Sequence, residues 1–402
     1  MPKKRPDNAV FIFAGARTPI GYPYRGLKEF TAAQLATFAI KGICQRSRID
    51  KRWIDEVILG NVVAAGTGQN LARQAALAAG VPATVPAFTV NNVCGAGLQA
   101  VILAAQSVAL RKADLILAGG TESASQSPYF VKRVEAENYE KKIKDLDPMD
   151  CLQHDGLFCP MTGQKMGELA QKLAHRFDIS RADQDDYAFE SHRKACLAQK
   201  QGKFKKEIVS LRNHEKTIHH DEHPRKTLER AWLDKLPPVF WTGGTVTAGN
   251  SAPSCDGAAV VAVGSPDFQK KHKRKPLARI IGYASIAVPP ENVFESTNTV
   301  IEACLEECRL QSRDIDFFEI SEAFAAQIVL VERKTNIPRS KINVFGGDLA
   351  LGHPLGTAGA RILVTLLNVL RDRKKKRGLA CVSFGGGGAI AMVIERVVSN
   401  PF

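Results

Sequence analysis

Residues 48–60 (RIDKRWIDEVILG) align without gaps on residues 309–321 (RLQSRDIDFFEIS), at an offset of 261 positions. Each segment follows an amphipathic stretch that predicts a helix, over residues 33–45 and 297–308, and ends in an apolar stretch that predicts a strand. Two copies of one helix–strand unit this far apart predict two halves with the same topology.

A second pair of segments supports this duplication. The stretch VNNVCGAGLQA at 90–100 precedes an expected helix over 96–110 and an expected strand over 114–118 that ends in Gly119-Gly120. The stretch GHPLG at 352–356 precedes an expected helix over 358–370 and an expected strand over 379–384. Alternation of helices and strands predicts an α/β fold with mostly parallel, buried sheets.

The two halves are separated by a more polar, irregular stretch. We expect an N-terminal half over residues 1–122, completed by 248–275, a loop domain over 123–247, and a C-terminal half over 276–402. The loop domain contains one clear helical stretch, 181–201, with Ser180 as its expected N-cap. We interpret it as an insertion that covers an active site.

Composition excludes several classes of protein. The chain has 402 residues, of which 45% are hydrophobic and 24% charged, as in ordinary globular proteins. It has no apolar run of about 18 residues, so we expect no membrane span, and its first residues lack the apolar core of a signal peptide. Nine cysteines without paired spacings favour free thiols and a cytoplasmic location.

The formal net charge of +14 comes largely from three basic clusters, at 203–206, at 270–275 with Arg279, and at 371–377. Polyanion binding is one interpretation. The clusters lack interleaved aromatic residues and match no nucleic-acid motif, so we favour solvated surface charge and expect no nucleic-acid partner. The histidines at 219, 220 and 223 lack the spacing of a metal site, and we expect no metal.

Cys94 is the first candidate catalytic residue. It lies at the expected N-terminus of a helix, where the helix dipole favours a thiolate, and Gly95 and Gly97 leave room for a substrate carbonyl. A buried, unreactive cysteine is the alternative. His353 lies at the matching place in the second half, and ligands of α/β folds bind at such strand ends. We therefore expect His353 to meet Cys94 and to activate it.

Six motifs in order give the chain a resemblance to the thiolases over essentially its whole length. They are ARTPIG at 16–21, NVCGAG at 92–97, GGTES at 119–123, GTVTAGN at 244–250 with Asp256-Gly257, EAFAAQ at 322–327, and GHPLG at 352–356. The resemblance implies duplicated αβαβα halves with an inserted loop domain, and a homodimer or homotetramer. It also implies coenzyme A thioesters as substrates, with no permanently bound cofactor, and a place in fatty acid metabolism.

The resemblance assigns roles to individual residues. Cys94 would accept the acyl group, His353 would activate it, and the backbone N–H groups of Cys94 and Gly385 would form an oxyanion hole. The positions that match the family's coenzyme A contacts are Leu157, Met166, Arg225, Phe240, Ala248 and Phe324. Ala252 replaces a serine near the pantetheine.

The chain departs from the family at positions that serve the second half-reaction. Ser383 stands where the family has a second cysteine that removes the α-proton, and Ser321 stands where an asparagine holds a water. Lys165 replaces a histidine. A serine hydroxyl is far less acidic than a thiol, so we expect impaired condensation and thiolysis. Cys381, two residues earlier on the same strand face, could substitute only if the register shifted.

Three functions follow in decreasing order of preference. The first is an acetyl-CoA C-acetyltransferase or 3-ketoacyl-CoA thiolase that works through a Cys94 acyl-enzyme. The second is a thiolase-like acyltransferase or thioesterase with a different acceptor. The third is a non-catalytic acyl-CoA binding subunit, which the presence of both Cys94 and His353 disfavours.

Overall fold

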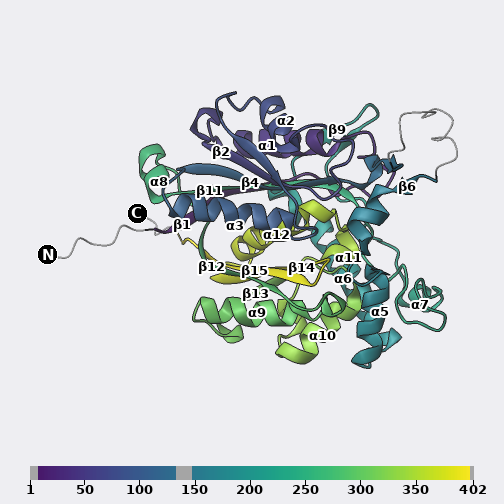
Figure 1. Cartoon of the computed structure of the whole chain (residues 1–402). Coiled ribbons are helices and arrows are strands. Elements are labelled where there is room, and N and C mark those ends of the chain that lie inside the picture. Colours follow the sequence, from purple (N-terminus) through teal and green to yellow (C-terminus); the bar gives the residue numbers. More distant parts are fainter. Residues whose placement is uncertain (1–7, 133–146, 399–402) are drawn as a thin grey trace, which may run out of the picture.

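The computed structural model describes residues 8–132 and 147–398 and contains one large mixed sheet (Figure 1). Nine strands are hydrogen-bonded in the order β13-β14-β15-β12-β1-β11-β4-β2-β3. Their bounds are β1 Val10–Arg17, β2 Glu56–Gly60, β3 Ala87–Val90, β4 Leu115–Ser123, β11 Asp256–Gly264, β12 Ala278–Ala287, β13 Phe317–Ile320, β14 Arg377–Phe384 and β15 Gly388–Arg396.

The two halves of this sheet have the same pairing pattern. In the first half β2 is parallel to β4, and β11 is antiparallel to both β4 and β1. In the second half β13 is parallel to β14, and β15 is antiparallel to both β14 and β12. Strands β1 and β12 join the halves at Val10 and Ile280. The predicted duplication is confirmed, but the expectation of mostly parallel strands is wrong, since five of the eight neighbouring strand pairs are antiparallel. Strand β15, for example, follows β14 after three residues, a connection too short for a parallel pair.

Helices cover the sheet in layers (Figure 1). Helices α1 and α2 lie outside the first half-sheet, α9 and α10 lie outside the second, and α3 and α12 pack against each other between them. The bounds are α1 Ala32–Ser47, α2 Leu71–Ala78, α3 Ala96–Ala109, α9 Ser296–Glu307, α10 Ala325–Thr335 and α12 Ala358–Asp372. Because helices lie on both faces, every residue of β4 and β11 is buried, and apolar residues dominate both strands.

The glycines of β4 bring the two halves into close contact. The strand does not end at Gly119-Gly120, as the sequence predicted, but continues to Ser123. A Cβ atom at Gly120 would lie 1.9 Å from the Gly356 carbonyl oxygen, and one at Gly97 would lie 2.7 Å from the same oxygen. These glycines therefore mark a close backbone approach rather than a turn.

The segment between β4 and β11 forms helices and short hairpins. The predicted helix with the Ser180 N-cap is present as α6, and Ser180 accepts a hydrogen bond from the Asp183 N–H. The bounds are α5 Met166–Arg176, α6 Arg181–Lys200, α7 Arg230–Asp234, β5 Tyr129–Phe130, β6 Met149–Asp150, β7 Phe158–Cys159, β8 Gln164–Lys165, β9 Leu211–Arg212 and β10 Thr217–Ile218. In the described part of the chain, the α-helices not yet named are α8 Pro266–His272 and α11 Asp348–Leu351. The three-part domain division stays a prediction; β11 lies between β1 and β4, as that division requires.

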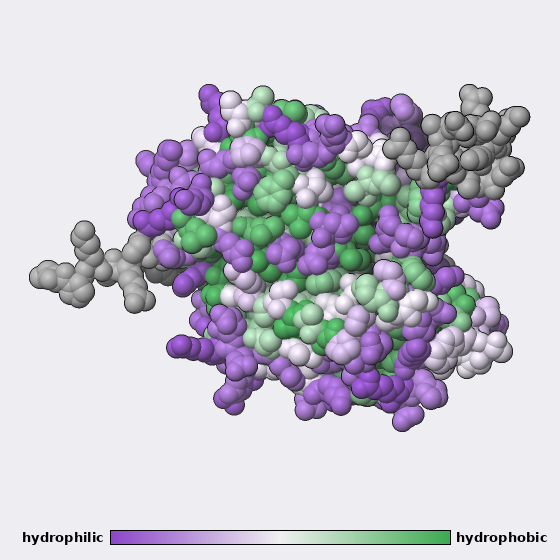
Figure 2. Space-filling view, viewed as in Figure 1, coloured by the Kyte–Doolittle hydropathy of each residue, from purple (hydrophilic) through white to green (hydrophobic). Residues whose placement is uncertain are grey.

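Polar side chains cover the outer helices on the face shown in Figure 2, and apolar side chains gather across its middle. Among the described residues, no helix combines the length and apolar character needed to cross a bilayer.

Candidate active site

Cys94 lies on a strained turn at the start of α3. The preceding residue, Val93, has a φ of 46°, a left-handed conformation that β-branched residues rarely adopt. Asn91 holds this turn, because its Oδ1 accepts from the Val93 N–H at 3.0 Å and its Nδ2 donates to the Val62 carbonyl at 3.2 Å. Gly95, the N-cap of α3, packs tightly against Phe384. The turn fixes the thiol at the helix N-terminus, and strain of this kind is common at functional sites.

His353 approaches Cys94 from the other half of the molecule. Its loop is held by backbone hydrogen bonds from the His353 N–H to Pro253 and from the Cys255 N–H to His353. The imidazole is 5% exposed, and the Cys94 side chain is near enough to stabilise its charged form. Nε2 has no well-formed hydrogen bond within the described residues. The structure thus brings the two predicted residues together.

Asp348, which the sequence analysis missed, lies on the other side of the His353 ring. Its Oδ2 is 3.0 Å from His353 Nδ1 and accepts a hydrogen bond from the Ser321 hydroxyl. Its Oδ1 accepts from Arg361 Nη2. Asp348 and Arg361 are both fully buried. A line of groups therefore runs from Cys94 through His353 and Asp348 to Arg361.

The charges of this line control the pKa of each member. Burial alone would lower the pKa of His353, but the interactions with Cys94 and then with Asp348 raise it to about 10. Burial alone would raise the pKa of Asp348, but Arg361 and then His353 hold it well below its usual range. An imidazolium beside a carboxylate suits a cysteine that must act as a thiolate.

Glu319 is a second carboxyl group near Arg361, at the end of this line. Its Oε2 is 3.9 Å from Arg361 Nη1, and neither carboxyl oxygen has a hydrogen-bond partner within the described residues. Burial raises the pKa of Glu319 well above its usual value. Asp348, which accepts a hydrogen bond from Arg361, is therefore the closer carboxyl partner of this guanidinium.

Ser383 lies at the end of β14 and is 5% exposed. Its hydroxyl accepts a hydrogen bond from Gln327 Nε2 at 3.1 Å, and the same nitrogen donates to Thr297. Cys381 is buried in the cluster beneath α9 and α10, and β14 pairs with β15 without a register shift. The shift that Cys381 would need to replace Ser383 is therefore absent.

Two backbone N–H groups near Cys94 are available to a substrate. Neither the Cys94 N–H nor the Gly385 N–H donates a hydrogen bond within the described residues. Gly385 is adjacent to the strained turn, because a Cβ atom placed on it would lie 3.7 Å from Val93 Cγ1. That Cβ would lie 3.6 Å from Met166 Sδ, so Met166 also borders this region.

The other predicted coenzyme A contacts fall into three places. Leu157 packs in the apolar cluster that includes Cys94. Phe240 and Phe324 form an edge-to-face pair with ring centroids 6.4 Å apart. Arg225 lies over the Trp232 ring at 4.9 Å in the inserted segment, and Ala248 is exposed. Lys165 is exposed at the N-cap of α5.

Glu122 is a further buried carboxyl group that the sequence analysis did not single out. It accepts hydrogen bonds from the N–H groups of Val62, Val63 and Gly356 and from Asn61 Nδ2. Burial raises the pKa of Glu122 to about 7. Because Gly356 follows His353 in the chain, Glu122 ties the His353 loop to the first half.

Comparisons with known proteins agree with this geometry. Two family models match the chain, "Thiolase, N-terminal domain" over residues 10–267 and "Thiolase, C-terminal domain" over residues 274–396. The chain is 42% identical over 394 residues to the acetyl-CoA acetyltransferase of Escherichia coli strain K12, an alignment that covers 97% of this chain and 99% of that protein. It is 39% identical over 396 residues to the acetyl-CoA acetyltransferase of Allochromatium vinosum, covering 97% and 100%. The crystal structure of human mitochondrial 3-ketoacyl-CoA thiolase in complex with CoA superposes with a TM-score of 0.93 at 38% identity, covering 97% and 98%.

Proposed function

The chain belongs to the thiolase family, and from that premise we propose that it is a CoA-dependent acyltransferase that works through an acyl-enzyme on Cys94. Its reaction is that of an acetyl-CoA C-acetyltransferase or 3-ketoacyl-CoA thiolase, which belongs to fatty acid metabolism. The observation that carries the proposal is the placement of Cys94 against His353, with Asp348 at 3.0 Å on the far side of the imidazole.

The first half-reaction uses groups that are all present. The Cys94 thiolate attacks the carbonyl carbon of an acyl-CoA, and the N–H groups of Cys94 and Gly385 donate to the resulting oxyanion. Each such donor contributes on the order of 3 kcal/mol to transition-state stabilisation. When the C–S bond of the substrate breaks, coenzyme A leaves as a thiolate and takes the proton of the His353 imidazolium. Acyl-Cys94 remains.

The second half-reaction depends on Ser383. Condensation requires removal of an α-proton from a second thioester, and cleavage of a 3-ketoacyl-CoA requires return of that proton. The Ser383 hydroxyl accepts a hydrogen bond from Gln327 and is far less acidic than a thiol. It therefore cannot exist as the anion that would take up the α-proton and later return it. We therefore propose that acylation of Cys94 is fast and that the carbon–carbon step is slowed.

A second candidate function follows from the same serine. An acyltransferase or thioesterase needs no α-proton abstraction, because its acceptor is water or another nucleophile. Ser383 favours this alternative, whereas the buried line of Cys94, His353 and Asp348 disfavours a non-catalytic binding subunit.

We assign the coenzyme A moiety to the residues matched on the family. Leu157, Met166, Phe240 and Phe324 supply apolar contacts for the pantetheine, Ala248 lies beside it, and Arg225 binds a phosphate. Arg225 is held over Trp232, and Met166 and Leu157 border the Cys94 region. The positions of Met166 and Leu157 beside Cys94 support the assignment of the pantetheine to this region.

We further propose a cytoplasmic homo-oligomer, dimer or tetramer. The nine cysteines are unpaired, which supports a reducing compartment. Strand β3 is the edge of the sheet and carries Phe88, a large apolar residue that is 39% exposed. An unpaired edge strand with an exposed aromatic side chain favours association with a second copy. Light scattering coupled to size-exclusion chromatography measures the assembly.

One experiment tests the catalytic proposal. The protein is incubated with acetyl-CoA, peptides are mapped by mass spectrometry for an acetyl group on Cys94, and acetoacetyl-CoA thiolysis is assayed in parallel. We expect an adduct on Cys94, slow thiolysis, and faster thiolysis by Ser383→Cys. Cys381→Ala is the matched control on the same strand and should change neither readout.

The outcomes separate the candidates. Fast thiolysis by the unaltered chain would refute the limiting role of Ser383. Acyl-Cys94 that hydrolyses without thiolysis, unaltered in Ser383→Cys, would favour the thioesterase. An absent adduct would remove the catalytic proposal altogether.

A further inference from the structure

The fold brings the three basic clusters of the sequence to one place on the surface. Two adjoining cavities of about 400 Å³ and 550 Å³ share Gly15, Lys206, Lys275, Leu277 and Arg371 as lining residues. We call their union the basic hollow. Eight cationic side chains line it: Arg46, Lys205, Lys206, Lys273, Arg274, Lys275, Arg371 and Arg396. The one lining carboxylate, Glu207, is buried and bound to Arg17 at 2.7 Å.

These eight cations lack the partners that their sequence neighbours have. None of them forms an ion pair with a carboxylate in the part of the chain that the structure describes. By contrast, Lys203 pairs with Asp372 at 2.8 Å, and Arg377 pairs with Glu395 at 2.6 Å. Lys203 and Arg377 of the same clusters do not line the hollow and are neutralised, whereas the eight lining cations keep their charge without a carboxylate partner.

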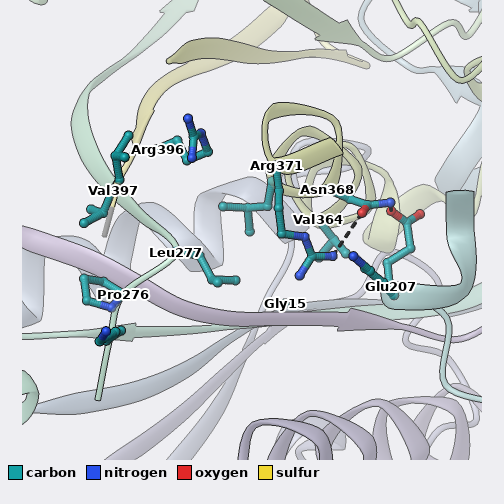
Figure 3. A pocket seen from close by; sticks show the side chains of 13 residues that line it. Gly15, Glu207, Pro276, Leu277, Val364, Asn368, Arg371, Arg396 and Val397 are labelled. Carbon is teal, nitrogen blue, oxygen red and sulfur yellow. Dashed lines mark hydrogen bonds between the residues drawn. The ribbon is translucent and has the colours of Figure 1, made fainter. Parts of the chain in front are cut away.

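The shape of the hollow strengthens its positive potential. Figure 3 shows Arg371 and Asn368 on α12 and Arg396 at the end of the C-terminal strand around the same space, with Gly15 and Leu277 beneath them. Leu277, Val364 and Leu367 give the hollow an apolar floor. Positive charges around a hollow with an apolar floor concentrate the electric field inside it and attract anions.

The basic hollow is separate from the catalytic residues. Arg371 is in the last turn of α12, whereas His353 precedes the first turn of this 15-residue helix. At 1.5 Å per residue the helix places them roughly 20 Å apart. None of the residues assigned to coenzyme A lines the hollow, so the two sites are distinct.

We propose that the basic hollow binds a soluble polyphosphate, either inorganic or carried by a nucleotide. One guanidinium group can donate two parallel hydrogen bonds to the oxygens of a phosphate, and an ammonium group attracts phosphate as a compact positive charge. A lining of both lysine and arginine therefore suits several adjacent phosphates. A concave space of several hundred Å³ fits a small ligand. A nucleic acid is disfavoured, because stacking needs an exposed aromatic ring, and the lining Phe13 is 7% exposed and packs on Phe268.

Calorimetric titration of the full chain with sodium tripolyphosphate tests the proposal. We expect saturable binding at one site per chain that weakens as salt rises above about 0.15 M. The triple variant K206E/K275E/R371E should lose affinity by about tenfold or more, since it reverses charge at the centre of the hollow. K112E/K216E/R313E, which makes the same change in net charge at exposed sites outside the hollow, should bind as the unaltered chain does.

Further arms identify the ligand and separate this site from the acyl-transfer site. Adenosine triphosphate should bind as tripolyphosphate does if phosphates alone are recognised, and tighter if the base contributes. Arg225→Ala should retain tripolyphosphate binding, and the hollow variant should retain acetylation of Cys94. If the triple variant fails to fold, K206Q/K275Q/R371Q removes the same charges more gently.

Several results would overturn the proposal. If tripolyphosphate does not bind the unaltered chain, the proposed site does not exist. If the control variant loses as much affinity as the hollow variant, the binding reflects only diffuse surface charge. Retained binding by the hollow variants places the phosphates elsewhere, and stronger binding of duplex DNA or of phosphatidylserine vesicles identifies a different class of partner. None of these results depends on whether Cys94 is acylated.

Discussion

Replacing Asp348 with asparagine tests the charge line behind Cys94. The substitution keeps the size of the side chain and removes the negative charge 3.0 Å from His353 Nδ1. A neighbouring opposite charge at this range shifts a pKa by about 1–3 units. We therefore expect the pKa of His353 to fall from about 10 by that amount, which is about 1.4–4 kcal/mol less stabilisation of the imidazolium.

The reactivity of Cys94 should follow that pKa. In the unaltered chain, His353 stays positively charged through neutral pH, and this charge stabilises the thiolate form of Cys94. In Asp348→Asn, the ring begins to lose its proton near neutrality, so the thiolate is less populated. Alkylation of Cys94 by iodoacetamide, followed by peptide mass spectrometry from about pH 5 to pH 10, measures the effect, and NMR of labelled histidine reports the pKa directly.

The effect on stability has a definite sign. Because the pKa of His353 is raised in the folded chain, its stabilising contribution is complete below about pH 6.5 and is lost as the pH rises through about 10. The stability difference between Asp348→Asn and the unaltered chain should therefore be largest near pH 6 and shrink toward pH 10. Urea unfolding at several pH values measures it.

Ser321→Ala is the matched control, because it removes one hydrogen bond to Asp348 without changing the charge. It should leave the alkylation profile of Cys94 close to that of the unaltered chain. If Asp348→Asn, correctly folded, gave the same profile as the unaltered chain, the assignment of Asp348 as the charge partner of His353 would be refuted.

Three further predictions concern other parts of the molecule. Arg225→Ala should raise KM for acetyl-CoA about tenfold through loss of a charge-assisted contact, whereas Lys226→Ala, at the exposed neighbour, should not; equal KM values would remove Arg225 from the site. Gly97→Ala should lower the free energy of unfolding by about 1–3 kcal/mol, because its Cβ would lie 2.7 Å from the Gly356 oxygen; unchanged urea unfolding would contradict the close approach. Burial, with smaller effects of His223 and Arg225, lowers the pKa of His192 to about 3, so protonation of this one histidine should remove about 3 kcal/mol of stability between pH 6.5 and pH 4. His192→Asn should lose less stability than the unaltered chain over this interval; equal acid sensitivity would contradict a neutral, buried His192.

The sequence could predict the duplicated fold and the meeting of Cys94 with His353 because both depend on local patterns. The repeat at 48–60 and 309–321 becomes β2 and β13 in equivalent places of the sheet, and the stretches around Cys94 and His353 precede α3 and α12. Ligands bind beyond equivalent strand ends in the two halves, so recognition of the duplication was enough to predict that Cys94 and His353 meet.

The contacts that the sequence could not predict are tertiary. Asp348 stands among apolar residues, and only the single turn of α11 brings its carboxylate back to His353 five positions later. An acidic residue shortly before a candidate catalytic histidine, within an apolar segment, was the available signal. Gln327 of α10 donates a hydrogen bond to Ser383 of β14, and the hydrophobic periodicity of the sequence cannot predict such a contact between two elements. Gly119 and Gly120 suggested a strand end because the backbone groups that require them are distant in sequence: Ala259 of the neighbouring strand for Gly119, and Gly356 of the other half for Gly120.

The charge line also indicates how acylation changes the site. Cys94 contributes more than Asp348 to the raised pKa of His353. An acyl group on Cys94 prevents a thiolate from forming, so this contribution is lost and the pKa of His353 falls. His353 is then able to act as a base in the second half-reaction, whereas in the free enzyme it is held as an acid.

Ser383 offers no thiolate that could accept the α-proton, so the acyl-enzyme is the state that should accumulate. Asp348 limits how far the pKa can fall, because its charge stays 3.0 Å from Nδ1 throughout the cycle. The balance between acylation and onward transfer therefore depends on two residues, Asp348 for the charge of the histidine and Ser383 for the fate of the proton.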